Sequence, residues 1–205
     1  DMIETLIRDY ANPTADSEYC RFRDYDLYEG HSWAGGYADN DSGNNQESAS
    51  ESLFSWIGMY LWGVLTEQDS YRDAGIFGFT NEMETVKQYW FDYDRTTDAD
   101  GKVTNSNWVS DYPYQVVAQV YGAINFYGTF FGGQPLYCYG IHWLPISEYL
   151  TYYGTNQTRC AQIYQGLLDD TDKAIEYAVI DAKAEGKSEE EIEKIKNDYT
   201  RADTG

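Results

Sequence analysis

The chain has 205 residues, which is enough for one domain with a substantial core. Its 35 acidic and 14 basic residues leave a formal net charge of −21, which argues against nucleic acid and anionic membrane surfaces, because both attract Lys and Arg. No stretch approaches the roughly 18–20 apolar residues of a membrane span. Three cysteines have no metal-type spacing, and one disulfide with a free thiol is possible: Cys20, Cys138 and Cys160.

The first half of the chain predicts helices separated by polar loops. Residues 2–10 form a short predicted helix, and residues 13–44 a long loop, because Gly, Asp and Asn are frequent and no period is sustained. Loops longer than about 12–15 residues are usually functional or disordered, and the Trp and Tyr content favours function here. A helix over residues 45–63 is apolar on nearly every side after two turns, which predicts burial. Another helix is expected over residues 73–90.

The second half continues in the same way. Residues 92–111 are a polar connection, and residues 114–126 (YQVVAQVYGAINF) predict a further apolar helix. Three more helices are expected over residues 147–153, 157–185 and 188–199, the last opened by a capping box. Strand-like runs are scarce. Helices alternating with long polar loops indicate an all-α fold, a toroid of helical hairpins, as one region over residues 1–205.

Residues 23–51 have an unusual composition for a folded segment. They combine carboxylates, aromatic rings and carboxamides with hardly an aliphatic side chain, so core packing does not account for them. Acid/base groups, a stacking surface and hydroxyl-binding amides are what a sugar-cleaving groove needs. Single aspartates in a Gly-rich loop are more often turn formers. The candidates in the first part are Asp24, Asp26, Glu29, His31 and Trp33, the last as a stacking platform.

Two glutamates, Glu47 and Glu51, are four residues apart on the predicted helix, with Cβ atoms about 5–6 Å apart on one face. Glu47 falls in the first turn, where the helix dipole favours the ionised form that suits a general base. The competing interpretation is structural, because Ser48 and Glu51 also match a capping box. The sequence leaves both interpretations open.

The two histidines, His31 and His142, have no paired spacing, so no metal site is expected. His142 and Trp143 lie just before Pro145, which marks a helix start. This segment is either a second wall of the groove or a packed loop.

Taken together, the motifs resemble family 81 of the glycoside hydrolases, the endo-β-1,3-glucanases. The combination of GHSWA and NQESxSE is the most specific, and the motif-bearing part is residues 6–150. The matching segments are LIRDYANP (6–13), YEGHSWAGG (28–36), NQESASE (45–51), MYLWG (59–63) and YGIHWLPISEYL (139–150).

The resemblance implies an (α/α)6 barrel and inverting hydrolysis of internal β-1,3 bonds in laminarin or callose, without metal or other cofactor. It assigns the general base to Glu47, a supporting role to Glu51 and a place in the cleft wall to Asp26. It also implies an enzyme that is secreted or at the cell surface. It suggests His31 and Trp33 as substrate contacts, and the sequence adds further candidates for substrate binding: Tyr28, Asn45, Gln46, His142 and Trp143.

One departure from the family pattern concerns the general acid. In the family it is an aspartate farther upstream of the NQES glutamates than the 46 residues that precede Glu47 here. An inverting pair needs carboxyls about 6.5–9.5 Å apart, whereas Glu47 and Glu51 would lie on the same side of the bond. The family's N-terminal β-sandwich is absent, and the predicted helices are too few for six hairpins. The chain is therefore expected to be a piece of the enzyme, whose remainder is its partner.

Two alternatives come from other classes of function. The first is a non-catalytic β-glucan-binding or structural module that lacks the general acid. The second is another toroid-fold glycosidase, acting on β-1,4-glucan or chitosan.

Overall fold

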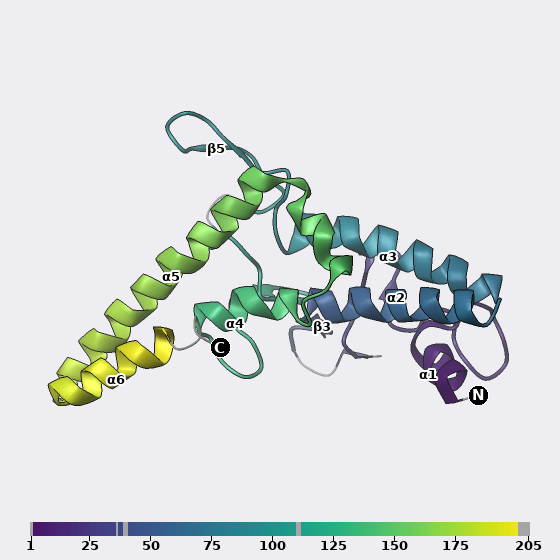
Figure 1. The fold of residues 1–205 in the computed structure, drawn as a ribbon, viewed down its shortest axis with the longest axis horizontal. Coiled ribbons are helices and arrows are strands. Elements are labelled where there is room, and N and C mark those ends of the chain that lie inside the picture. The colour runs from purple at the N-terminus through teal and green to yellow at the C-terminus, as the bar shows by residue number, and fades with distance from the viewer. Residues whose placement is uncertain (1, 36, 39–40, 110–111, 201–205) are drawn as a thin grey trace.

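The computed structural model describes residues 2–35, 37–38, 41–109 and 112–200. Helices supply most of its regular structure, so the prediction of a mainly helical chain is confirmed (Figure 1). None of the described helices is long and apolar enough to cross a membrane. The α-helices are α1 (Met2–Ala11), α2 (Ala49–Leu65), α3 (Asp69–Tyr89), α4 (Pro135–Gly140), α5 (Gln157–Ala184) and α6 (Glu189–Thr200), and the 3₁₀-helices are η1 (Ile141–Trp143) and η2 (Glu148–Thr155).

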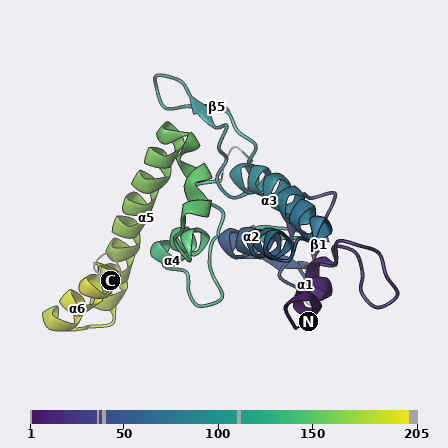
Figure 2. The ribbon, with the colours of Figure 1, turned by 45° about the vertical axis from the view of Figure 1, so that its right-hand side comes forward.

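The helices form two arms. Helices α2 and α3 lie side by side as a helical hairpin, while α5 runs away from them and packs against α6 (Figures 1 and 2). Gly75 allows the close approach in the hairpin, since a Cβ there would lie 2.5 Å from the backbone nitrogen of Tyr60. The predicted hairpin architecture is thus present in one clear instance, and a closed barrel is not seen in the described residues.

The strands are short and all pairings between them are antiparallel. In the first sheet Tyr25 pairs with Ser32, and in the second Asn45 pairs with Tyr121. The strands are β1 (Tyr25–Asp26) with β2 (His31–Ser32), β3 (Asn45–Gln46) with β6 (Gln119–Tyr121) and β7 (Asn125–Phe126), and β4 (Thr96–Thr97) with β5 (Val103–Asn105). The second sheet brings residues 45–46 and 119–126 together, far apart in sequence.

The prediction of a helix over residues 114–126 is wrong. Residues 116–118 are fully buried without regular helix, and β6 and β7 follow as a hairpin. A short apolar run that is buried on all sides has no amphipathic period, so its pattern does not separate helix from extended chain. The β-branched Val116, Val117 and Val120 favour the extended form.

Other boundaries also differ from prediction. Helix α2 begins at Ala49 rather than residue 45, because Asn45 and Gln46 pair with β6. Helix α3 begins at Asp69, and the predicted helix after residue 147 is a 3₁₀-helix. The capping box at Ser188 is confirmed, since Glu191 accepts from the Ser188 backbone N–H (2.8 Å) and Ser188 Oγ accepts from the Glu191 N–H (3.3 Å). Gly36 of the second motif and Asp111 of the polar connection lie outside the described residues.

Helix α2 contributes side chains to both clusters of buried residues that form the core. Leu53 belongs to the larger cluster, with Trp90, while Trp56 and Met59 belong to the smaller one, with Ile7 of α1. The last turns are different, because Leu61, Val64 and Leu65 are exposed. The prediction that this helix is buried on nearly every side after its first two turns is therefore wrong for its last turns.

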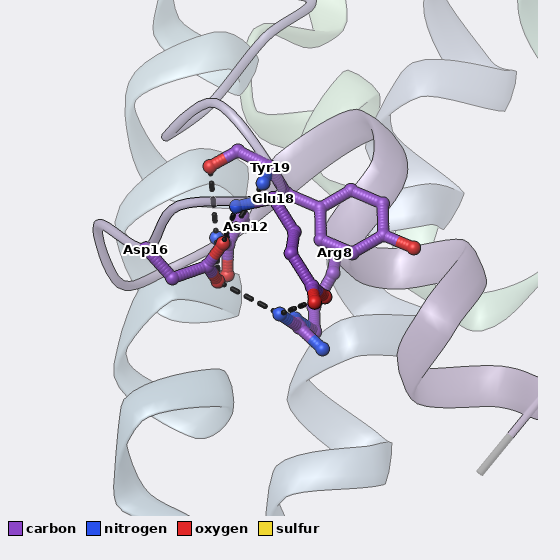
Figure 3. A network of polar contacts seen from close by, with 5 residues as sticks. All are labelled: Arg8, Asn12, Asp16, Glu18 and Tyr19. Carbon is purple, nitrogen blue, oxygen red and sulfur yellow. Dashed lines mark hydrogen bonds and ion pairs between the residues drawn. The ribbon is translucent and has the colours of Figure 1, made fainter.

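A polar network fixes the chain after α1 (Figure 3). Asp16 Oδ1 accepts from the backbone N–H groups of Glu18 and Tyr19, both at 2.8 Å, and Oδ2 accepts from Arg8 (2.9 Å) and Asn12 (2.8 Å). The Tyr19 N–H and the Arg8 guanidinium, followed by the other donors, hold the pKa of Asp16 well below its usual range. The start of the predicted long loop is thus folded onto α1.

All three cysteines are free thiols. Cys138 is fully buried, and that burial raises the pKa of its thiol to about 12, so it stays protonated. The disulfide that the sequence left possible is not formed.

Candidate active site

A cleft of about 400 Å³ lies at the N-terminal end of α2. Its walls come from α1, the β1–β2 region, β3, the first turns of α2 and the loop after β7. It is lined by Tyr10, Asp24, Ser32, Trp33, Ala34, Asn45, Gln46, Glu47, Ser48, Glu51, Ser52, Ser55 and Phe130. Asp24, Glu47 and Glu51 are among these residues and no Lys or Arg is, so the cleft is acidic.

Backbone hydrogen bonds align three extended segments along the cleft. The Trp33 N–H donates to the Asp24 carbonyl oxygen at 2.7 Å, and the Ala34 N–H donates to the Asn45 carbonyl oxygen at 2.7 Å. Residues 33–34 therefore lie between Asp24 on one side and Asn45 on the other. The turn that leads into this arrangement contains Gly30 at φ +76°, a left-handed conformation that favours glycine.

Glu47 lies just before α2 rather than in its first turn, so the predicted helix-dipole argument does not apply to it. Glu47 Oε1 accepts from the Phe130 N–H at 2.7 Å and from Gln119 Nε2 at 3.4 Å. Burial raises the pKa of Glu47; the Phe130 hydrogen bond opposes this and the nearby Glu51 adds to it. The carboxyl is thus held in place by groups from a distant part of the chain.

One half of the predicted capping box is formed at Glu51, and the catalytic interpretation of its side chain stays a prediction. Ser48 is the N-cap of α2, and its Oγ accepts from the Glu51 backbone N–H at 3.3 Å. The exposed Glu51 side chain lines the cleft beside Glu47. The cap is therefore formed by the backbone of Glu51, which leaves its carboxylate available.

Asp26 does not line the cleft with Glu47. Its Oδ1 accepts from the N–H groups of Tyr28 (2.8 Å) and Glu29 (3.1 Å), and Oδ2 accepts from the Trp33 indole (3.3 Å). Burial alone would raise the pKa of Asp26, but the two backbone hydrogen bonds and the indole outweigh it and lower the pKa. Asp26 thus fixes a turn and orients Trp33, and Tyr28 points its exposed side chain outside the cleft.

His31 and His142 were expected to contact substrate. Both side chains are 0 % exposed and neither lines the cleft, so a direct contact stays a prediction. The His31 ring packs against Trp33, with ring centroids 4.4 Å apart, and against Trp90, at 5.2 Å. The His31 ring therefore holds the Trp33 ring in position.

His142 supports the start of α2 in a similar way. Its Nδ1 accepts from the Ala49 N–H at 3.5 Å, and Nε2 lies 3.0 Å from the Val117 carbonyl oxygen. Ser50 Oγ also donates to the Leu144 carbonyl oxygen at 2.5 Å. Trp143 packs on Tyr153, with ring centroids 4.1 Å apart, and does not line the cleft. Residues 141–144 are therefore a packed support, the second of the two predicted alternatives.

The carboxamides of β3 occupy different positions. Asn45 lines the cleft, and its buried Oδ1 has no hydrogen-bond partner among the described residues. Gln46 is mostly buried and donates to the Ser48 carbonyl oxygen at 3.2 Å. Both residues thus contribute to the lining of the cleft, and the Gln46 amide also shapes the turn into α2.

Glu82 of α3 is a supporting residue that the sequence did not reveal. It is 0 % exposed, and it accepts from the Ser32 N–H (2.8 Å), from Ser32 Oγ (2.7 Å) and from the Trp56 indole (2.6 Å). These bonds tie β2, and hence Trp33, to the α2–α3 hairpin. A lone Glu in an amphipathic helix gives no signal of this role, because its partners lie 26 and 50 residues away.

We expect Glu82→Ala to lower the free energy of unfolding by about 3 kcal/mol, because it leaves three buried donors without an acceptor. Glu82→Gln should cost less, since the amide oxygen still accepts. Thermal unfolding monitored by circular dichroism measures both. The exposed Glu84 of the same helix is the matched control, and a Glu82→Ala midpoint equal to that of Glu84→Ala would contradict the assignment.

No group of three or more His, Cys, Asp or Glu side chains within the described ranges is placed to hold a metal ion. The chemistry that the cleft offers from its own residues is that of carboxyls, hydroxyls and two carboxamides beside an indole ring.

Comparison with known proteins gives consistent results. A family model described as the glycosyl hydrolase family 81 C-terminal domain matches residues 1–176. A glucan endo-1,3-beta-D-glucosidase of Acetivibrio thermocellus is 34 % identical over 168 residues, and one of Thermobifida fusca is 32 % identical over 168 residues. Each alignment covers 82 % of this chain, but only 20 % and 21 % of the respective relative. The chain thus spans about one fifth of the length of these relatives.

A solved structure also resembles the chain. It is a glycoside hydrolase family 81 protein from Clostridium thermocellum, with a TM-score of 0.73 and 32 % sequence identity. The match covers 89 % of this chain and 26 % of the solved one. Since the family model covers well over half of the residues and the helical fold agrees, the chain belongs to glycosyl hydrolase family 81.

Proposed function

We propose that the cleft is the general-base side of an endo-β-1,3-glucanase active site. The observation that carries the proposal is that Glu47 and Glu51 line one acidic cleft together with Trp33 and Asn45. An acidic cleft without a basic lining residue suits a neutral polymer and disfavours an anionic one. The related glucan endo-1,3-beta-D-glucosidases point to a β-1,3-glucan as that polymer.

In the proposed mechanism Glu47 takes a proton from the attacking water. Its fixed carboxylate keeps one defined orientation, because Phe130 and Gln119 hold the same oxygen, Oε1. The exposed carboxylate of Glu51 lies beside it and holds the water or a sugar hydroxyl. An inverting reaction then needs a general acid about 6.5–9.5 Å away across the bond, which we place on another part of the enzyme.

Substrate binding is proposed for the middle of the cleft. The half-buried Trp33 supplies a ring for the apolar face of a pyranose, and Asp26 and His31 hold that ring in place. Asn45 supplies a carboxamide to the sugar hydroxyls. We further propose that the α2–α3 hairpin is one unit of an (α/α)6 barrel, completed by the remainder of the enzyme, and that the enzyme acts outside the cell or at its surface.

The test is a substrate panel on the full-length protein. We expect release of reducing ends from laminarin but not from carboxymethylcellulose or chitosan, and products whose anomeric configuration, followed by NMR, is inverted. Activity on either of the other polymers would favour another toroid-fold glycosidase. Binding of laminarioligosaccharides without any release of reducing ends would instead make the chain part of a non-catalytic glucan-binding module.

A pH profile tests the assignment of the base. Because burial raises the pKa of Glu47, opposed by the Phe130 hydrogen bond and reinforced by Glu51, the acidic limb of kcat/KM should lie above the ordinary value of 4.5. Glu51→Gln removes the neighbouring charge and should shift that limb to lower pH. The acidic limb is measured from initial rates on laminarin between roughly pH 3 and 8. The same limb position in Glu51→Gln and the wild type would contradict an effect of Glu51 on the pKa of Glu47.

A further inference from the structure

We propose that Asp24 is a further substrate-binding residue, whose Oδ1 accepts a hydrogen bond from a sugar hydroxyl in the cleft. The inference rests on the proposed glucanase function and adds a residue that the family motifs do not include. Asp24 lines the same cleft as Glu47 and Glu51. Its Oδ1 is buried and has no hydrogen-bond partner among the described residues.

The position of the carboxylate is fixed by its surroundings. The Asp24 N–H donates to the Tyr10 carbonyl oxygen (3.3 Å), and the Asp24 carbonyl oxygen accepts from the Trp33 N–H (2.7 Å). The other side-chain oxygen, Oδ2, lies 3.5 Å from Arg23, which is itself held by Asp9. The main chain is therefore bonded on both sides, and Arg23 holds one oxygen while the other remains unpaired.

An unpaired buried acceptor is unfavourable unless a ligand supplies the donor. Burial raises the pKa of Asp24, which Arg23 opposes and Asp9 reinforces, as expected of a carboxylate that lacks a donor in the free protein. A sugar hydroxyl is a neutral donor that fits this need. An anionic ligand is disfavoured, because Glu47 and Glu51 share the cleft.

The comparison with Asp26 shows why Asp24 is the one available. Asp24 and Asp26 are two positions apart, and side chains at that spacing share one face of an extended segment. Their different roles therefore come from their hydrogen-bond partners. Both oxygens of Asp26 accept from Tyr28, Glu29 and Trp33. Asp26 is therefore occupied with the turn, whereas Asp24 has a free oxygen.

A second unpaired acceptor lies across the same segment. Asn45 Oδ1 is also buried without a partner among the described residues, and residues 33–34 separate Asn45 from Asp24. A pyranose ring that stacks on Trp33 directs its hydroxyls outward from the ring edge. Asp24 and Asn45 thus flank the Trp33–Ala34 segment, and each has one unpaired side-chain oxygen.

The experiment compares Asp24→Ala and Asp24→Asn in the full-length protein, with laminarin kinetics and calorimetric binding of laminarihexaose. Loss of a hydrogen bond to a charged group corresponds to a roughly 10- to 150-fold rise in KM for Asp24→Ala. Asp24→Asn keeps a neutral acceptor and should rise less. The thermal midpoint should stay equal or increase in both variants, because an unpaired buried group is removed or neutralised. Asp9→Ala is the matched control, since it removes the outer partner of Arg23 without touching the cleft.

The outcomes separate this inference from the proposed function. An unchanged KM in Asp24→Ala, with a wild-type protein that cleaves laminarin, would overturn the role of Asp24 alone. A fall in kcat at constant KM would also overturn it, in favour of a direct part in the chemistry. If Asp24→Ala does not fold, the KM of Asp24→Asn decides whether Asp24 binds substrate. A wild-type KM together with a lowered thermal midpoint in Asp24→Asn would show that Asp24 has a structural role only. Failure of the wild-type protein to bind or cleave laminarin would overturn the glucanase proposal itself.

Discussion

Glu47→Gln in the full-length protein is expected to lower laminarin hydrolysis by roughly 10²- to 10⁴-fold, the range typical of a positioned acid/base group. The amide cannot accept a proton from water at neutral pH. Its Oε1 can still accept from the Phe130 N–H and from Gln119, so the loop after β7 keeps its place. The loss should therefore appear in kcat, with little change in fold or in binding of laminarihexaose.

Three measurements make this prediction specific. Reducing-end release gives the rate, circular dichroism reports the fold, and calorimetry reports binding. Glu18→Gln is the matched control, because Glu18 is an exposed glutamate whose ion pair with Arg8 lies outside the cleft. Turnover of Glu47→Gln within tenfold of the wild type would be incompatible with Glu47 as the general base.

The sequence predicted the helices whose signals are local. The apolar stretch of α2, the amphipathic pattern of α5 and the capping box of α6 each depend on neighbours within four residues. The β3–β6 pairing depends on residues more than 70 positions apart, and it converts Asn45 and Gln46 from the expected helix start into a strand. A long-range pairing of two residues leaves no period in the sequence, which is why the start of α2 was misplaced.

The candidate site shows the same division. Sequence motifs located Glu47, Glu51, Trp33 and Asn45, and all four line one cleft. They did not separate side chains that face the cleft from those that support it, because burial depends on the packing of distant segments. His31 and His142 are supports, and Asp24 rather than Asp26 reaches the cleft.

His142 gives the second large prediction, a loss of stability as the pH falls. Burial lowers the pKa of the His142 imidazole to about 3 in the folded protein, with the Val117 carbonyl opposing the shift, from an ordinary value of 6.5. Between these two values the unfolded chain binds a proton that the folded chain does not. The contribution of His142 to the free energy of unfolding is thus complete above pH 6.5 and falls by up to about 1.4 kcal/mol per pH unit down to about pH 3.

Carboxylates also titrate in this range, so the test compares the wild type with His142→Gln. The difference between their free energies of unfolding is measured by urea unfolding at pH 7, 5 and 4, which span roughly that interval. We expect His142→Gln to be less stable at pH 7, because the amide does not fill the space of the fully buried ring, but to lose less stability on acidification. Trp143→Phe controls for general weakening of the same turn and should shift stability equally at every pH. Parallel pH curves for wild type and His142→Gln would contradict a neutral buried imidazole.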